Sequence, residues 1–148
     1  MLLLVLAVVL ASHVVRSGQR IWRGYAEGIG YDATAWHTSP LVQFVKRLPR
    51  NAVIYSNGAD ALSYLTGRFV RFVPFRFDRR TGRANPVQRQ ISSVQEIARE
   101  RDVYVVFADT INWRFYALRE NELVNAIPLR LIERFPDGRV YGEPPSRG

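Results

Sequence analysis

The chain has 148 residues, 47% of them hydrophobic and 23% charged, which fits one packed domain and argues against wholesale disorder. It has no cysteine, which excludes a disulfide framework, cysteine-ligated zinc, an iron–sulfur cluster and a thiol nucleophile, and two histidines are too few for a multi-histidine metal site. The net charge of +8 attracts any polyanion or acidic membrane surface but names no partner. We expect neither a metal nor a cofactor.

The chain begins with an unbroken apolar run, Met1–Ala11, which Val14 and Val15 extend to roughly fifteen residues, short of the roughly twenty that span a bilayer. A secretory signal peptide would need a preceding cationic region, which is missing, although Val9–Ala11 fits a small-residue cleavage site. A core helix would show a polar face, and none occurs before Ser12. We favour the C-terminal part of a transmembrane helix that begins upstream, as in the tail of a longer membrane protein.

The residues after the apolar run fit a membrane exit. Arg16, Arg20 and Arg23 are cationic, and Trp22 and Tyr25 have the amphipathic rings that favour the headgroup zone. These arginines alone would favour a cytoplasmic location for the rest of the chain. That bias is summed over all loops of a membrane protein, so one flank does not fix the orientation.

The composition divides the chain into four parts. We expect residues 1–23 to be the end of a transmembrane helix with its juxtamembrane segment. Residues 24–38 hold three glycines and no apolar period, which predicts a linker. Residues 39–142 carry regular hydrophobic patterns and should form the folded domain, and residues 143–148 should be a disordered tail.

Local patterns in the domain predict alternating helices and strands. Ser39 and Pro40 begin a helix as N-cap and first helical residue, with an apolar stripe that runs to Leu48. Val103–Ala108 should be a central strand buried on both faces. The other expected elements are strands at 52–56 and 69–73, helices at 59–66 (closed by Gly67), 93–101 (opened by a capping box at Ser93–Glu96) and 113–122, and a hairpin of 129–135 and 139–141 around Asp137–Gly138.

These elements predict an α/β fold. We expect a three-layer, Rossmann-like domain with a mostly parallel sheet and an antiparallel C-terminal hairpin, preceded by part of a transmembrane helix.

The order of the segments also carries a resemblance. An apolar helix stub and an aromatic linker are followed by SPLVQFVKRLP, AVIYSNGADALSYLTGR, VYVVFA and FPDGRVY. This succession, which covers the chain to about Gly142, resembles the soluble C-terminal domain of multi-pass bacterial glycosyltransferases. These are relatives of the protein O-mannosyltransferases and the lipid A aminoarabinose transferase, which use a polyprenyl-phosphate-linked sugar as donor.

The resemblance implies a place in the cell membrane with the folded part outside the cytoplasm. In such enzymes the catalytic acid lies in an early loop near the first membrane helix, and sugar transfer is metal-assisted at the membrane face. That loop is absent here, so the resemblance supplies no catalytic residue. The implied partners are the membrane, the rest of the membrane-embedded polypeptide, and a polyprenyl-phosphate sugar or anionic lipid headgroups.

Polar residues follow two of the expected parallel strands. Asn57, Gly58 and Asp60 come after the first and Asp109 after the third, at the edge where open parallel sheets bind ligands. They could bind a hydroxyl or a phosphate at a helix N-terminus, or they could only cap the helix and turn and complement the helix dipole. The sequence lacks dinucleotide and P-loop fingerprints, since Gly28–Gly30 lies in the linker and not after a strand.

The segment Phe75–Gln90 breaks the periodicity and predicts a long basic loop. Its guanidinium groups could hold a lipid diphosphate, a phosphate carrier or anionic headgroups, because arginine binds phosphate through two parallel hydrogen bonds. The alternative is a solvated loop in a chain where arginine replaces lysine almost everywhere. Against one acid, Asp78, the loop carries Arg76, Arg79, Arg80, Arg83 and Arg89.

Three functions stay open. The first is a non-catalytic accessory domain of a membrane glycosyltransferase. The second is a nucleic-acid-binding module, but the arginines are dispersed and no binding motif occurs, so we expect no specific nucleic-acid partner. The third is a free-standing enzyme for a phosphate-containing substrate, with Ser56, Asp60 and Asp109 as possible nucleophile or base. We adopt the first, with a free-standing basic α/β module that binds phosphate-containing ligands or nucleic acid as the alternative.

Overall fold

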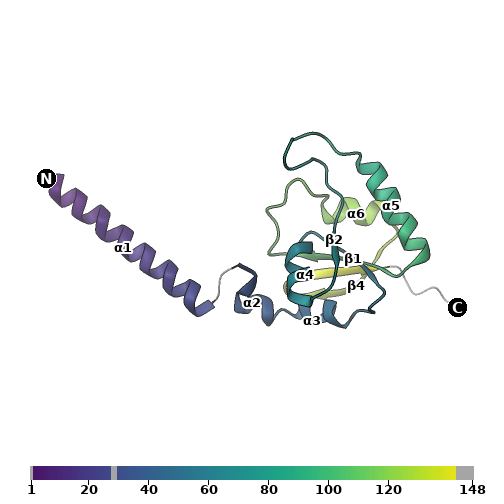
Figure 1. The fold of residues 1–148 in the computed structure, drawn as a ribbon, viewed down its shortest axis with the longest axis horizontal. Coiled ribbons are helices and arrows are strands. Elements are labelled where there is room, and N and C mark those ends of the chain that lie inside the picture. Colours follow the sequence, from purple (N-terminus) through teal and green to yellow (C-terminus); the bar gives the residue numbers. More distant parts are fainter. Residues whose placement is uncertain (1, 28–29, 143–148) are drawn as a thin grey trace. The chain divides into compact units, whose positions relative to one another are not determined.

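A computed structural model describes residues 2–27 and 30–142 of the chain (Figure 1). Its contacts divide the chain into two units, residues 1–38 and 39–148. The expected tail at 143–148 lies outside the described residues.

The first unit is helical throughout most of its described length. It consists of α1 (Leu2–Glu27), the short 3-10 helix η1 (Gly30–Asp32) and α2 (Thr34–His37). The sequence between 24 and 38 shows no apolar period, yet the chain forms helical turns there, and the rings of Tyr31 and Trp36 meet edge to face at 6.2 Å. No helix in the described part of the chain is both long enough and apolar enough to cross a membrane.

The second unit is built on one mixed sheet of five strands in the order β2-β1-β3-β5-β4. The pairs β1–β2 and β1–β3 are parallel, and β5 runs antiparallel to both β3 and β4, so four strands share one direction. This confirms the α/β class, the mostly parallel sheet and the C-terminal hairpin at one side. The strands are β1 (Val53–Ser56), β2 (Val70–Phe72), β3 (Val103–Ala108), β4 (Arg130–Phe135) and β5 (Gly138–Gly142).

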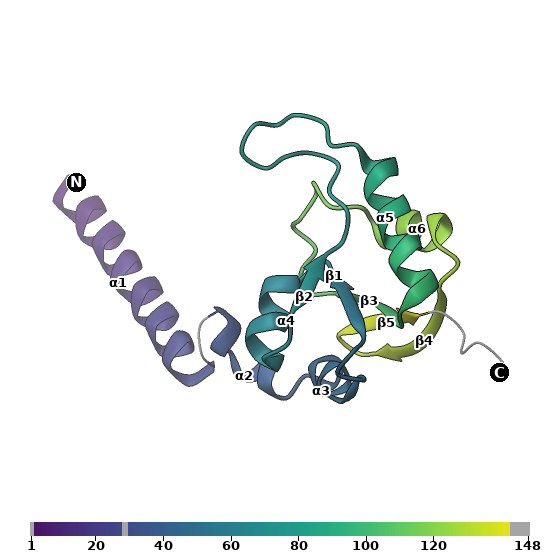
Figure 2. The ribbon, with the colours of Figure 1, turned by 45° about the vertical axis from the view of Figure 1, so that its right-hand side comes forward.

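Helices cover both faces of this sheet. Figure 2 shows α4 on one side of β1–β3 and α5 with α6 on the other, and α3 packs on α4. An apolar cluster joins α5 and α6 to buried residues of β1 and β3. β3 is central and buried, as its continuous apolar run predicts. The helices are α3 (Pro40–Arg47), α4 (Ala59–Thr66), α5 (Val87–Glu100) and α6 (Glu120–Ala126).

The predicted ends of α3 and α4 are confirmed in detail. The Ser39 hydroxyl accepts the backbone N–H of Val42 at 3.0 Å, as an N-cap does. Gly67 closes α4 in the left-handed region, at φ 66°.

The predicted start of α5 is wrong. The helix begins at Val87, directly after Pro86, and the capping-box pattern at Ser93–Glu96 lies inside it. The reason is packing. Ile91, Val94 and Ala98 form one buried stripe, and Ile91 lies before Ser93, so the helix must include the turn that precedes the capping-box pattern.

The predicted helix at 113–122 is also wrong. The segment before Glu120 is irregular because it pairs with the chain that follows β2: Phe75 and Ala117 form an isolated antiparallel bridge, and Leu118 donates to the Pro74 carbonyl at 2.9 Å. Long-range pairing thus overrides helix propensity, and α6 begins where the Glu122 carboxylate accepts the Arg119 N–H at 2.9 Å.

The hairpin turn lies one residue earlier than its pattern suggests. Phe135 pairs with Gly138, so Pro136 and Asp137 form the turn and Gly138 begins β5. A Cβ on Gly138 would meet Cδ2 of Leu41 at 2.7 Å and press on the backbone oxygen of Phe107. The glycine is therefore required by close approach of the chain.

We predict that Gly138→Ala lowers the free energy of unfolding by about 2–3 kcal/mol, because the backbone of β3 cannot retreat without breaking the sheet. Gly67→Ala is the matched control, since its Cβ would enter open space and the left-handed φ alone should cost about 1 kcal/mol. Urea unfolding of both variants measures the difference. Equal losses would show that the contact with β3 is unimportant.

Candidate functional site

The predicted ligand edge coincides with a switch in the chain path. From β1 the chain runs through α4 to β2, and from β2 through α5, on the other face, back past β1 to β3. In open α/β sheets, ligands bind outside the carboxyl ends of strands where the path diverges in this way. The predicted residues Asn57, Gly58, Asp60 and Asp109 all lie at this edge.

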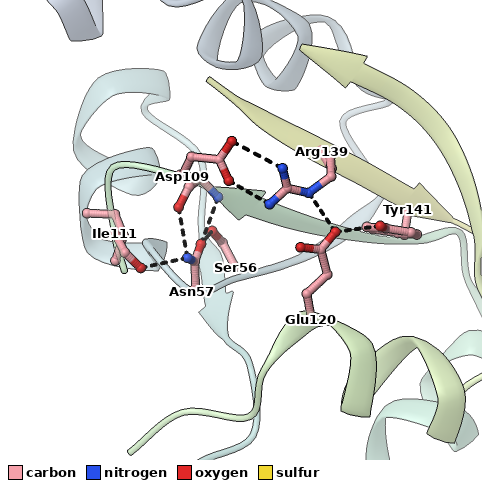
Figure 3. Close-up of polar contacts among 8 residues, drawn as sticks. Ser56, Asn57, Asp109, Ile111, Glu120, Arg139 and Tyr141 are labelled. Carbon is pink, nitrogen blue, oxygen red and sulfur yellow. Dashed lines mark hydrogen bonds and ion pairs between the residues drawn. The ribbon is translucent and has the colours of Figure 1, made fainter. Parts of the chain in front are cut away.

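The Asn57 side chain fills the space between the ends of β1 and β3 (Figure 3). Its Nδ2 donates to the carbonyls of Ala108 and Ile111, both at 2.9 Å, and its Oδ1 accepts the Ala108 N–H at 2.9 Å. Both ends of the amide are thus bound to backbone at the last residue of β3 and just after it. This geometry gives Asn57 a structural role at the position predicted to bind a hydroxyl or a phosphate.

Ser56 and Gly58 fill the rest of the crevice at the carboxyl ends of β1 and β3. Ser56 is fully buried, and its hydroxyl accepts the Gly58 N–H at 2.9 Å and points toward Asn57. A Cβ on Gly58 would meet Cγ1 of the buried Ile111 at 3.0 Å. The switch-point crevice is therefore occupied by the chain's own residues, and Ser56 is withdrawn from solvent.

Asp60 neutralises a buried arginine. Nη2 of Arg114 donates to Oδ1 and Oδ2 of Asp60 at 2.8 and 2.6 Å, and the Arg114 side chain is 2% exposed. The guanidinium carbon lies 5.0 Å from the Phe72 ring and 4.7 Å from the Trp113 ring, within cation–π range. Nε and Nη1 of Arg114 make no hydrogen bond to the described residues. The local pattern around Asp60 gives no sign of this partner, which is 54 residues away.

Asp109 belongs to a chain of polar contacts that crosses to the C-terminal hairpin (Figure 3). Arg139 donates to Asp109 through Nη2 at 2.5 Å and Nη1 at 3.1 Å, and its Nε donates to Glu120 Oε1 at 2.6 Å. The Tyr141 hydroxyl donates to the same Glu120 oxygen at 2.5 Å. Sequence reasoning missed Arg139, Glu120 and Tyr141. The position of Arg139 depends on the pairing of β5 with β3, which sets Arg139 opposite Phe107 and which local sequence does not specify.

These contacts shift two pKa values upward. The carboxylates of Glu120 and Asp109 raise the pKa of Arg139, and burial followed by the bond to Glu120 raises the pKa of Tyr141. A cavity of about 300 Å³ opens beside the network, and its wall includes Asp109, Arg114, Glu120 and Arg139. Each of these four charges is paired with an opposite charge, and Arg119, which is exposed, adds a further cation to the wall.

The arginines of the predicted phosphate loop contact different partners. Arg76 forms an ion pair with Glu122, Arg79 lies over the Tyr116 ring at 5.3 Å, and Arg80 and Arg83 are exposed. Asp78, the one acid of the loop, fixes the turn. Its Oδ1 accepts the N–H groups of residues 80 and 81 at 2.9 and 2.8 Å, and these hydrogen bonds lower the pKa of the Asp78 carboxyl group. None of these contacts gathers the four arginines around one point.

Comparison with models of protein families, with curated proteins and with solved structures returned no match for this chain. Within residues 2–27 and 30–142, no group of three or more histidine, aspartate or glutamate side chains is placed to hold a metal ion.

We predict that Asn57→Ala lowers the free energy of unfolding by about 2–3 kcal/mol, because it removes three hydrogen bonds and leaves part-buried backbone groups unpaired. Asn112→Ala, on the exposed part of the same loop, is the matched control and should change stability by less than about 0.5 kcal/mol. Equal urea midpoints for the two variants would contradict the structural role of Asn57.

A second prediction concerns pH. The hydrogen bond from Arg76 and that from the Arg119 N–H lower the pKa of Glu122, so this pair stabilises the fold above the ordinary pKa of a glutamate and loses its effect as pH falls through the lowered value. In Arg76→Gln the Glu122 pKa should rise toward its ordinary value, as measured by NMR titration. The loss of stability at neutral pH should be about 0.5 kcal/mol, since both side chains are about one-third exposed. A Glu122 pKa unchanged by Arg76→Gln would refute the pairing.

Proposed function

We propose that this chain is the accessory, extracytoplasmic domain of an integral-membrane glycosyltransferase that takes its sugar from a polyprenyl-phosphate donor. In this proposal α1 includes the end of a transmembrane helix, and residues 39–142 form a Rossmann-like domain without a catalytic centre. The observation that carries the proposal is the apolar surface of α1.

α1 begins with residues 2–11, which are all apolar. Within residues 5–15, seven apolar side chains are between 47% and 71% exposed, and successive helix positions rotate by 100°, so these residues surround the axis. A helix that is apolar all round is normally buried, in a protein core or in lipid. The side chains are those of Val5, Leu6, Val8, Val9, Leu10, Val14 and Val15.

The second half of α1 has the residues of a membrane boundary. Arg16, Arg20 and Trp22 follow the apolar half, and arginine and tryptophan side chains favour the headgroup zone. An apolar half in lipid and a cationic, aromatic half among the headgroups would attach the α/β domain at the membrane surface, near a lipid-linked donor.

The carboxyl edge of the sheet supports a non-catalytic role. Asn57 is bonded to backbone, Ser56 is buried, and Asp60 and Asp109 are paired with arginines. A general base or nucleophile needs a lone pair directed at a substrate. The Ser56 hydroxyl and the Asn57 amide direct theirs into the fold, and each of the two carboxylates is held by a guanidinium group. The domain would instead help to hold donor or acceptor beside the rest of the membrane-embedded polypeptide.

We predict that the purified full chain floats with vesicles of anionic lipid that contain a labelled polyprenyl-phosphate sugar. The double variant Leu6→Asp/Leu10→Asp should reduce vesicle binding at least about tenfold, because a carboxylate in the bilayer core costs about 2.5–3.5 kcal/mol. The matched control Gln88→Asp/Ser92→Asp, on the exposed face of α5, makes the same charge change and should leave most binding intact.

The same vesicles test the catalytic part of the proposal. The chain alone should release or transfer no labelled sugar. Transfer of sugar to an added acceptor by the purified chain, or failure of the unmodified chain to float, would overturn the proposal.

A further inference from the structure

A second cavity lies at the opposite edge of the sheet, where the parallel strands begin. Its volume is about 550 Å³, and its wall includes the start of β1 at Ala52 and Val53 and the residue before β2, Phe69. Ten residues line it, all in the described part of the chain, and five of them are cations while none is acidic. The cations are Lys46, Arg50, Arg68, Arg71 and Arg101.

Three of the five cations are held in place by uncharged groups. Arg68 donates to the carbonyls at the end of α3, at 3.2, 2.6 and 2.5 Å for residues 45, 48 and 49. Arg101 donates to the Asn51 carbonyl at 2.7 Å, and Arg71 to the Tyr55 hydroxyl at 3.4 Å. These contacts orient the guanidinium groups but leave their formal charge uncompensated.

Helix dipoles account for only part of this charge. The C-terminal ends of α3, α4 and α5 all lie at this cavity, and each carries about half a negative charge, on the order of 1.5 in total. Five positive charges exceed that amount severalfold. An anion with several negative oxygens would relieve the remaining repulsion, and fixed arginines would lose little side-chain entropy on binding it.

We propose that this cavity binds a molecule that carries a diphosphate. The volume falls in the range of small-molecule sites and leaves room for a ring beside the phosphates. Phe69, which is 81% exposed at the cavity wall and lies 5.9 Å from the Arg71 guanidinium carbon, offers a ring face to a sugar or a nucleoside. The site lies within residues 46–101, and the inference does not depend on the proposed membrane role.

The test is calorimetric titration of the full chain, in detergent, with inorganic pyrophosphate. Lys46→Gln/Arg50→Gln removes two exposed cations from the cavity wall and should weaken binding at least about tenfold, since hydrogen bonds to charged groups contribute about 1.5–3 kcal/mol. Arg80→Gln/Arg83→Gln makes the same change of net charge in the exposed loop and should alter binding by less than about twofold.

Two further probes distinguish the sources of a diphosphate. Vesicles that carry polyprenyl diphosphate are compared with free pyrophosphate for each variant. If the unmodified chain binds both the vesicles and free pyrophosphate, and Lys46→Gln/Arg50→Gln weakens both, the site accepts the lipid-linked diphosphate. If the unmodified chain binds free pyrophosphate but not the vesicles, the site takes a soluble ligand. Either outcome supports the inference.

Three results would overturn the inference. The first is pyrophosphate binding that does not saturate, and the second is equal weakening by the two double variants, which would indicate a general charge effect. The third is a single-stranded oligonucleotide that binds more tightly than pyrophosphate and depends on Lys46 and Arg50 in the same way, because the cavity would then belong to a nucleic-acid surface.

Discussion

The amide of Asn57 joins the two strands on which the domain is organised. Its three bonds, two to the last residue of β3 and one to Ile111, fix how the β1–α4 turn meets the loop that leads to α6. With that loop fixed, Ile111 packs against Gly58, and Arg114 is carried to Asp60. An asparagine is suited to this position because one planar group both accepts and donates, and so satisfies N–H and C=O groups that the end of a strand leaves unpaired.

The buried guanidinium group of Arg114 requires a carboxylate beside it. Arg114 lies between aromatic rings with one carboxylate to balance it, so removal of that carboxylate would leave an uncompensated buried charge. Asp60 can meet this need only because it lies in the first turn of α4, where the helix dipole also favours an acid. One side chain thus serves both the helix and the neighbouring loop.

Local patterns predicted the parts of the fold that depend on local energies. The Ser39 cap, the Gly67 C-cap and the continuous apolar run of β3 each express a preference of a few neighbouring residues, and the structure confirms them. The errors at 93–101 and 113–122 have a different origin, since there a buried stripe or a bridge to Phe75 decides the conformation. The same distinction holds at the site. The positions of Asn57 and Asp109 were predictable because they follow the ends of strands. The arginine partners were not, since the arginines that pair with Asp60 and Asp109 lie 54 and 30 residues away in the sequence.

The two edges of the sheet differ in whether their cations are paired with carboxylates. At the carboxyl edge each buried or half-buried arginine has its carboxylate, as in Arg139 with Asp109 and Glu120. At the amino edge the lining cations meet only carbonyls, a hydroxyl and rings. Like charges held close together repel one another, so a fold selected for stability alone would distribute its arginines more evenly over its surface. Concentration of five cations in one cavity lined by no acid is the arrangement expected when the compensating charge comes from a bound molecule.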